Sequence, residues 1–251
     1  MKRKFQHIAY LLMVAAVITS CGEKKQTSEF PDWAWADFQR PEGINPIVSP
    51  DTTTVFYCPM RQDSVAWESS DTFNPAATIY DGKVVVLYRA EDNSAVGIGS
   101  RTSRLGYAYS DDGLHFNRMT VPVFYPADDN QKELEWPGGC EDPRVAVTDD
   151  GLYVMLYTQW NRKQARLAVA TSRDLQIWEK YGPAFAKAYG GRFFDEFSKS
   201  ASIVTKLVDG KQVIAKIDGK YWMYWGEKFV NVRGGIIHNY PLVKIGTQYW
   251  M

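Results

Sequence analysis

The segment of this sequence with the clearest potential for chemistry runs from Gly138 to Arg144. Two adjacent carboxylates, Glu141 and Asp142, follow a pair of glycines, and Pro143 fixes the backbone behind them. Successive side chains of a strand point to opposite sides, so we expect one carboxylate to face a cleft and the other to bond to the scaffold. Arg144 would then share the side of Asp142 and could hold a carboxylate or a hydroxyl group. The alternative is a solvated acidic turn with a local salt bridge.

Two other segments add polar side chains that suit a cleft lined with hydroxyl-binding groups. One is Asn74–Ala77, with the sequence Asn-Pro-Ala-Ala, and the other is Tyr88–Asp92, which contains Arg89. Asparagine and arginine side chains both donate hydrogen bonds that can orient a polar ligand. The alternative is that Asn74 only supports a turn and Arg89 only supports the fold.

An internal repeat indicates which elements must position these residues. Asp-Gly pairs begin at positions 81, 150 and 218, which are 69 and 68 residues apart, and each precedes a run of β-forming residues. Asp-Gly before such a run is a hairpin signal, because glycine tolerates positive φ and aspartate bonds to its own backbone.

A second motif follows the first in the same order. Leu105–Phe116 aligns with Leu167–Trp178, and each consists of a strand with small residues, a turn containing serine and aspartate, and then an aromatic residue. Each unit is therefore interpreted as strand, turn, strand, turn, with no amphipathic helix predicted after the first twenty residues. Such units are typical of β-propeller blades with about four strands each. A β-sandwich with coincidental Asp-Gly turns is the alternative.

Composition excludes several functional classes. The formal net charge is zero and the pI is about 6.8, so the chain has no electrostatic signature of nucleic-acid binding. Aromatic residues make up 14% of the chain, which favours strands and is compatible with a sugar-binding cleft. With only three histidines and no Cys/His pattern, neither zinc nor any other cofactor is predicted, and a Ser-His-Asp hydrolase is disfavoured. Cys58 and Cys140 could pair in an exported protein, although their spacing does not require it.

The N-terminal residues resemble an export signal. A basic start at Lys2–Lys4 precedes an apolar run over Ile8–Ile18 that is too short to span a bilayer comfortably. The following Thr-Ser-Cys resembles a bacterial lipobox, which implies cleavage before Cys21 and attachment of lipid to it. We therefore predict a signal peptide over 1–20, a lipidated tether over 21–37, and a membrane partner through the lipid anchor. An ordinary secretory signal is the alternative.

Together these segments resemble glycoside hydrolase family 130. The resemblance rests on several motifs in order and runs from about Phe38 to about Asn231; they are Asn74–Ala77, Tyr88–Asp92, Gly139–Arg144, Ala165–Asp174 with Trp178, and Lys216–Glu227. It implies an all-β fold, a five-bladed β-propeller, and activity on a mannose-containing oligosaccharide or glycan. The relatives it suggests most directly are exported β-1,2-mannosidases.

The resemblance also implies roles for particular residues. Asp142 matches the family's catalytic acid, which is thought to act through a sugar hydroxyl, and Asn74, Arg89 and Lys216 match positions that hold the mannose unit at the cleavage point. Inverting glycosidases need a second carboxylate about 6.5–9.5 Å from the acid, which must come from a distant part of the sequence. Two candidates for this base remain open, as does the alternative that each is a structural carboxylate paired with a nearby lysine; they are Glu196, beside Lys199, and Glu227, beside Lys228.

The family resemblance does not decide whether water or phosphate attacks the sugar. Phosphorolysis benefits a cell only if the sugar phosphate stays inside, so the export signal favours an inverting β-mannosidase. A phosphorylase needs a cluster of cations for phosphate, and the sequence does not assign Arg144, Arg166 or Arg173 to one. A β-mannoside phosphorylase, a five-bladed furanosidase and a non-catalytic glycan-binding lipoprotein remain alternatives.

Chain length adds a last expectation. The blade pattern stops after Asn231, and the segment 232–251 is unlike the repeats before it, as after a frameshift or truncation. The predicted catalytic domain over 38–231 then holds about three blades, whereas five would need about 340 residues. An incomplete ring exposes strand edges, so weak activity and low stability are expected. A divergent last blade is the alternative.

Overall fold

The computed structural model describes residues 39–231 and 234–245, without the side chains of residues 188–189 and 227–245. The chain divides into two compact units, 1–42 and 43–251, and the fold below is that of the second. The predicted signal peptide, Cys21 and the tether lie outside the described residues. The strands and short helices are β1 (Phe56–Cys58), β2 (Asp63–Val65), β3 (Asp71–Tyr80), β4 (Lys83–Glu91), β5 (Ser103–Ser110), β6 (Asn117–Arg118), α2 (Lys132–Glu135), β7 (Gly139–Val147), β8 (Tyr153–Trp160), β9 (Ala165–Ser172), β10 (Glu179–Pro183), η1 (Ala188–Gly191), β11 (Ser198–Ile203), β12 (Thr205–Val208), β13 (Lys211–Ile214), β14 (Lys216–Ile217), β15 (Lys220–Asn231) and β16 (Gly234–Ile245).

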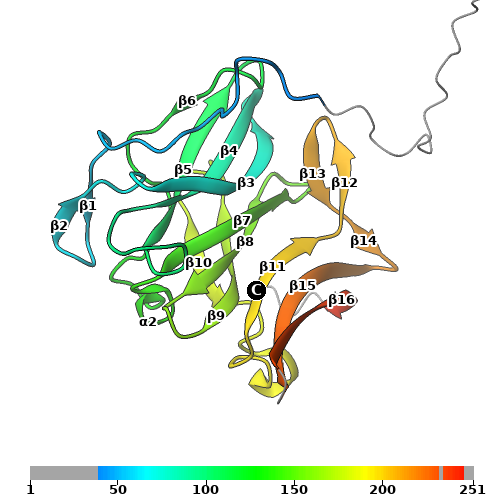
Figure 1. Ribbon diagram of the computed structural model, residues 1–251. Coiled ribbons are helices and arrows are strands. Elements are labelled where there is room, and N and C mark those ends of the chain that lie inside the picture. Colours follow the sequence, from blue (N-terminus) through cyan, green and yellow to red (C-terminus); the bar gives the residue numbers. More distant parts are fainter. Residues whose placement is uncertain (1–38, 232–233, 246–251) are drawn as a thin grey trace, which may run out of the picture. The chain divides into compact units, whose positions relative to one another are not determined.

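The first two groups of strands are antiparallel meanders that follow the predicted repeat (Figure 1). In the first, β3 pairs with β4, β4 with β5, and β5 with β6; in the second, β7, β8, β9 and β10 pair in the same succession. The β3–β4 turn places Asp81 at φ 49° and Gly82 at φ 71°, as a two-residue turn with two positive φ angles requires. The hairpins predicted from the Asp-Gly pairs are therefore confirmed.

The third group departs from this pattern. β11 pairs with β15, β15 pairs with β16, and β14 borders β15 through a turn at Asp218-Gly219. A hairpin of β12 and β13 is inserted between β11 and β15, around another Asp-Gly pair at 209–210. β16 falls in the segment predicted to be an aberrant tail, where its backbone continues the sheet.

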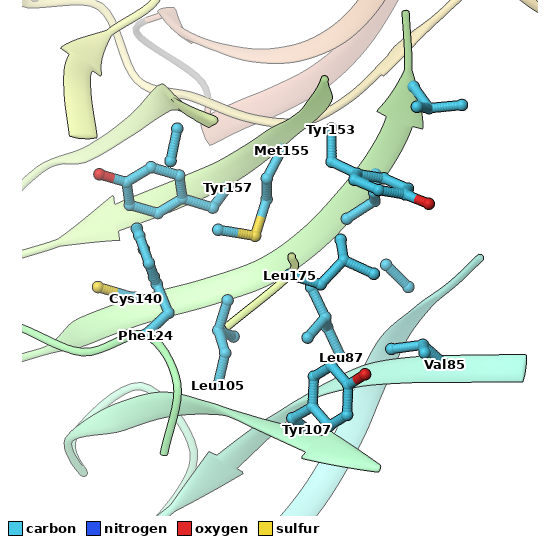
Figure 2. Packing of buried hydrophobic residues seen from close by; sticks show 14 of the residues in the cluster. Val85, Leu87, Leu105, Tyr107, Phe124, Cys140, Tyr153, Met155, Tyr157 and Leu175 are labelled. Carbon is cyan, nitrogen blue, oxygen red and sulfur yellow. The ribbon is translucent and has the colours of Figure 1, made fainter. Parts of the chain in front are cut away.

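The second meander is buried on both faces, because its central strands β8 and β9 are largely continuous apolar runs whose side chains point to the two faces in turn. Met155 and Tyr157 of β8 face the first meander (Figure 2), whereas Leu156 and Leu167 face the third group with Met223 of β15. The other face of the first meander is covered by β1, β2 and Trp67. These side chains exclude water and supply the main driving force for the fold. The prediction of an all-β fold built from blade-like sheets is confirmed.

The second repeated motif also forms the same structure twice. Ser110 Oγ accepts hydrogen bonds from the backbone N–H groups of Asp112 and Gly113, and Ser172 Oγ accepts them from Asp174 and Leu175. Each aspartate in turn accepts hydrogen bonds from the backbone N–H groups two and three residues further along the chain. Because one side chain bonds the backbone that follows it, the motif encodes its turn locally.

The structure also bears on the two cysteines and on membrane-spanning helices. Cys58 and Cys140 are both buried and unpaired, in separate apolar clusters. Among the described residues, no helix has the length and apolar character needed to cross a bilayer.

Candidate active site

The first strand of each group contains a bulge at one equivalent position. Asn74 in β3, Asp142 in β7 and Ser200 in β11 have φ angles of 45°, 52° and 55°. The strand register shifts at each of them, between Phe73 and Ala76 in the first case. A bulge adds one residue to its strand and re-aims the side chains around it. Three strands far apart in sequence therefore present comparable residues at their bulges.

The bulge in β7 overturns the prediction that Glu141 and Asp142 point to opposite sides. Both carboxylates contact the guanidinium of Arg89 and both face Lys199. The strict alternation of a strand holds only for extended backbone, and the positive φ of Asp142 breaks it. The two acids therefore form one buried pair rather than one cleft residue and one scaffold residue.

Arg89 is the centre of this group. Its Nη1 donates to Asp142 Oδ1 at 3.0 Å, and its Nη2 donates to Glu141 Oε1 at 2.9 Å and Glu91 Oε1 at 2.5 Å. Its Nε donates to Ser103 Oγ at 3.0 Å, and the ring of Phe73 lies 4.6 Å from its guanidinium carbon. Since only 3% of Arg89 is exposed, these bonds are made away from water and fix the positions of three carboxylates at once.

Asn74 and Lys199 complete the surroundings of Asp142. Asn74 Nδ2 donates to Asp142 Oδ1 at 2.8 Å, so this oxygen is held twice. Lys199 Nζ lies 3.1 Å from Glu141 Oε2 and 3.6 Å from Asp142 Oδ2. About a third of the Lys199 side chain is exposed, whereas Glu141 and Asp142 are buried, so Lys199 marks the solvent side of the cluster.

The two acids titrate in opposite directions from their ordinary values. Burial raises the pKa of Glu141, and the charges of Arg89 and Lys199 only partly offset it. Burial acts on Asp142 as well, but Arg89, the hydrogen bond from Asn74 and Lys199 together outweigh it and lower the pKa of Asp142. In the unliganded protein Asp142 is thus the more readily ionised of the pair, so acid catalysis by it requires a change in these contacts.

The structure brings together only some of the residues predicted for the site. Asp142, Asn74 and Arg89 are in direct contact. Arg144 does not join them, because its Nη1 donates to the carbonyl of Pro143 at 2.7 Å and its side chain lines a separate cavity with Ser202 and Gln212. The predicted alternation would have placed Arg144 beside Asp142, and the bulge between them removes that alignment.

Lys216 lies away from the cluster. It is exposed, its Nζ stacks over the Tyr221 ring at 5.0 Å, and it borders a cavity with Thr148 and Leu152, beyond the far end of β7. Asp142 lies six residues before Thr148, a separation of about 20 Å along a strand. β11 runs from the acids to that end, and the inserted β12–β13 hairpin starts and returns there, with the Ala215 N–H donating to the Val204 carbonyl. The lysine beside the acids is therefore Lys199, at the start of β11.

Both candidate bases approach the start of β11, where Lys199 lies. Glu196 is exposed in the turn before β11, with its backbone N–H donating to Phe193. The backbone of Glu227 in β15 is paired with Ser198, and its side chain lies outside the described residues. Lys199 makes its ion pairs with Glu141 and Asp142, so the suggested pairing of Glu196 with Lys199 is not formed.

The cluster also contains four residues that were not among the predicted site residues: Lys199, Glu91, Phe73 and Ser103. A signal for Lys199 exists, since Phe73, Glu141 and Lys199 each precede the bulge of their strand. The inserted hairpin hides it, because it lengthens the distance from β11 to its Asp-Gly turn and obscures the alignment of the third unit.

Comparison with known proteins gives a consistent result. The model of the family Glyco_hydro_130, described as beta-1,4-mannooligosaccharide phosphorylase, matches residues 39–237. A curated 1,2-beta-oligomannan phosphorylase from Thermoanaerobacter sp. (strain X514) is 36% identical over 152 residues, which cover 59% of this chain and 46% of the relative.

Solved structures extend the match. A candidate glycosidase from Bacteroides thetaiotaomicron VPI-5482 is 96% identical, with a TM-score of 0.77 over 80% of this chain and 59% of that one. A second structure is 62% identical, also with a TM-score of 0.77, over 86% of this chain and 62% of the other; its description states that the GH130 family of mannoside phosphorylases contains glycoside hydrolases targeting β-1,2 mannosidic linkages in Candida mannan.

The chain thus spans about half the length of the curated relative and about three-fifths of these solved ones. The family match covers all three bulged strands and the residues of the Arg89 cluster, and the propeller-type fold agrees with it. On this evidence the chain belongs to glycoside hydrolase family 130.

Proposed function

We propose that this protein cleaves β-mannosides, with β-1,2-linked mannose as the preferred substrate and Asp142 as the general acid. The observation that carries the proposal is that Asp142 Oδ1 accepts two hydrogen bonds, from Arg89 at 3.0 Å and from Asn74 at 2.8 Å. These bonds leave Oδ2, which faces Lys199 at 3.6 Å, as the oxygen from which a proton could be delivered. The 62% identical relative, whose description names β-1,2 mannosidic linkages, supports the linkage.

The contacts of Asp142 suggest how the acid could act. Its carboxyl must be protonated to serve as an acid, whereas its neighbours favour the ionised form before substrate arrives. Sugar hydroxyls that take over bonds from Lys199 or Asn74 would weaken this preference and could accept the proton for relay to the leaving oxygen. The enclosure of the pair favours such a transfer, because charge–dipole interactions are stronger where water is excluded.

Inverting hydrolysis also needs a carboxylate that activates water. Glu196 lies three residues before Lys199, a backbone separation of at most about 10 Å. Glu227 has its backbone opposite Ser198, one residue from Lys199. Both backbones therefore lie near Lys199, which contacts the acid pair, and inversion calls for a carboxylate about 6.5–9.5 Å from the acid. We keep both as candidates for the base.

Water is our proposed nucleophile, and phosphate is the second candidate because the curated relatives are named as phosphorylases. The predicted export signal supports water. A further support is that two arginines considered for a phosphate site are engaged elsewhere: Arg166 with Asp195 at 3.1 Å and Arg173 with Asp150 at 2.9 Å.

The test is product analysis with β-1,2-mannobiose in the presence and absence of phosphate. We expect mannose in both reactions, released with inversion as followed by NMR, and at least about a hundredfold loss of kcat in Asp142→Asn. Faster release of mannose-1-phosphate would establish the phosphorylase alternative. Binding of the disaccharide without turnover would identify a glycan-binding protein.

We also propose that Cys21 carries lipid and attaches the protein to the bacterial envelope, on the periplasmic or the outer surface. The support is the order of basic, apolar and small residues before this cysteine. Labelling cells with a palmitate analogue should mark the wild type and leave Cys21→Ser unmarked. Equal labelling of both would contradict the anchor.

A further inference from the structure

Glu141 contacts the same two cations as the proposed acid, Asp142. Each of its oxygens is bound to a different cation, Oε1 to Arg89 Nη2 at 2.9 Å and Oε2 to Lys199 Nζ at 3.1 Å. The same two cations contact Asp142, through Arg89 Nη1 at 3.0 Å and Lys199 Nζ at 3.6 Å. The two acids therefore compete for one pair of cations.

Other groups around the pair define the balance of charge. Glu91 of β4 shares Arg89, and Ser103 of β5 donates to Glu91 while accepting from Arg89. On β8, Thr158 lies opposite Glu141 in the register and is buried. Arg101, whose Nη1 is 3.5 Å from Glu91 Oε2, is the next cation outward. Glu141 is the only one of these acids that shares both Arg89 and Lys199 with Asp142.

We propose that Glu141 is a positioning residue for Asp142: its carboxylate shares the contacts of Arg89 and Lys199 with Asp142 and thereby keeps Asp142 able to hold the proton used in bond cleavage. This inference rests on the proposed function of Asp142 as the acid. Two neighbouring carboxylates oppose each other's ionisation, and a cation attracts an ionised carboxylate. Without the charge of Glu141, Asp142 loses a repelling neighbour, no longer shares Lys199 with a second acid, and shares Arg89 only with Glu91.

The sign of the effect follows from this. Glu141→Gln should lower the pKa of Asp142, so the protonated fraction at a given pH falls. The alkaline limb of the kcat profile, which reports the enzyme–substrate complex, should then move to lower pH by about one unit, which is about a tenfold loss above the limb. The loss should appear in kcat with KM within about twofold, because the amide keeps the shape of the side chain.

The experiment measures kcat and KM for β-1,2-mannobiose from pH 4 to 9 in the wild type and three variants. Glu141→Asp keeps the charge, but its shorter side chain reaches the cations less well. We therefore expect the alkaline limb of this variant to move to lower pH as well, by about half a unit. Lys199→Met removes the shared cation and should move the limb in the opposite direction, to higher pH. Glu133→Gln, an exposed glutamate on α2, is the matched control and should follow the wild-type profile.

An unchanged limb in a folded Glu141→Gln variant overturns the proposal, even if kcat falls at every pH. If that variant does not fold, Glu141→Asp decides in the same way. If the wild type does not cleave the disaccharide, either with water or with phosphate, the proposed function fails. In that case the carboxyl carbon of Asp142 is titrated by NMR, and its signal is assigned as the one missing from the spectrum of Asp142→Asn. A lower titration midpoint in Glu141→Gln than in the wild type supports the coupling, and an equal midpoint rejects it.

Discussion

At the residue scale, the site depends on Arg89 holding three buried carboxylates with one planar group. Its three nitrogens donate to Glu91, Glu141, Asp142 and Ser103, a geometry that a lysine ammonium cannot reproduce. Removing one partner of a buried ion pair destabilises a protein strongly, because the remaining charge stays buried without a counter-ion. Arg89 is therefore important for folding as well as for the site.

Arg89→Met should lower the free energy of unfolding by about 3–5 kcal/mol, since it leaves buried carboxylates without their cation. Urea denaturation followed by tryptophan fluorescence measures the change. Arg173→Met is the control, because Arg173 pairs with Asp150 at an exposed turn and should change stability by at most about 1 kcal/mol. Equal effects of both substitutions would contradict the central role of Arg89.

Asp142 should also leave a signature in the pH dependence of stability. Its pKa is lowered in the folded protein, so its ionised form contributes stability above the pKa of an unfolded aspartate, and that contribution is lost as pH falls through the folded value. Asp142→Asn should therefore destabilise the protein more at pH 7 than at pH 3. Urea midpoints at the two pH values test this, and a deficit that is the same at both would contradict it.

At the element scale, the bulges and the close approach of β5 to β7 place the two acids. Gly139, with φ 114°, opens β7, and a Cβ atom built on it would lie 2.2 Å from the carbonyl oxygen of Ser103. Ser103 itself bonds Arg89, so this approach links the start of β7 to the residues that hold Glu141 and Asp142. Only glycine permits both the conformation and the contact.

Gly139→Ala should therefore displace the start of β7, with a loss of stability of about 3 kcal/mol or more and a loss of sugar binding. Thermal unfolding and calorimetric titration with β-1,2-mannobiose measure the two effects. Gly219→Ala is matched in having a positive φ, 71°, but has open space around it. It should cost only about 1 kcal/mol of backbone strain and leave binding unchanged. Comparable losses in the two variants would contradict the role of the close approach.

At the scale of the whole molecule, the second meander joins the two neighbouring groups of strands because both its faces are apolar. Met155 and Leu156 are adjacent in β8, yet one belongs to the core with the first meander and the other to the core with the third group. If one neighbouring group of strands unfolded, an apolar face of the shared sheet would be exposed to water. Unfolding of one group should therefore destabilise the next.

Met155→Ala and Leu156→Ala should each lower stability by about 2–5 kcal/mol, as expected for buried side chains of this size. If the sheets unfold as one unit, both substitutions should move the same single transition. Near-ultraviolet circular dichroism and tryptophan fluorescence, recorded along a urea series, should then coincide. Separate transitions, with each variant moving only one, would show that the two cores unfold independently.

The sequence by itself determined the elements whose signals are local. Asp-Gly turns need positive φ at particular residues, and the Ser110 and Ser172 turns need only a side chain that bonds the next few backbone groups. Runs of β-forming residues after these turns likewise predict the strands, and the types and spacing of Asn74, Arg89 and Asp142 mark them as site candidates.

Only the tertiary structure decided how those residues meet. A bulge depends on the pairing of two strands, so the common orientation of Glu141 and Asp142 cannot be derived from an alternation rule. Lys199 reaches them from the start of β11, whereas Lys216, which the sequence favoured, lies at the other end of the same sheet. Charge and burial follow from these placements, because the pKa of a carboxyl is set by the neighbours that the fold brings to it rather than by those beside it in the chain.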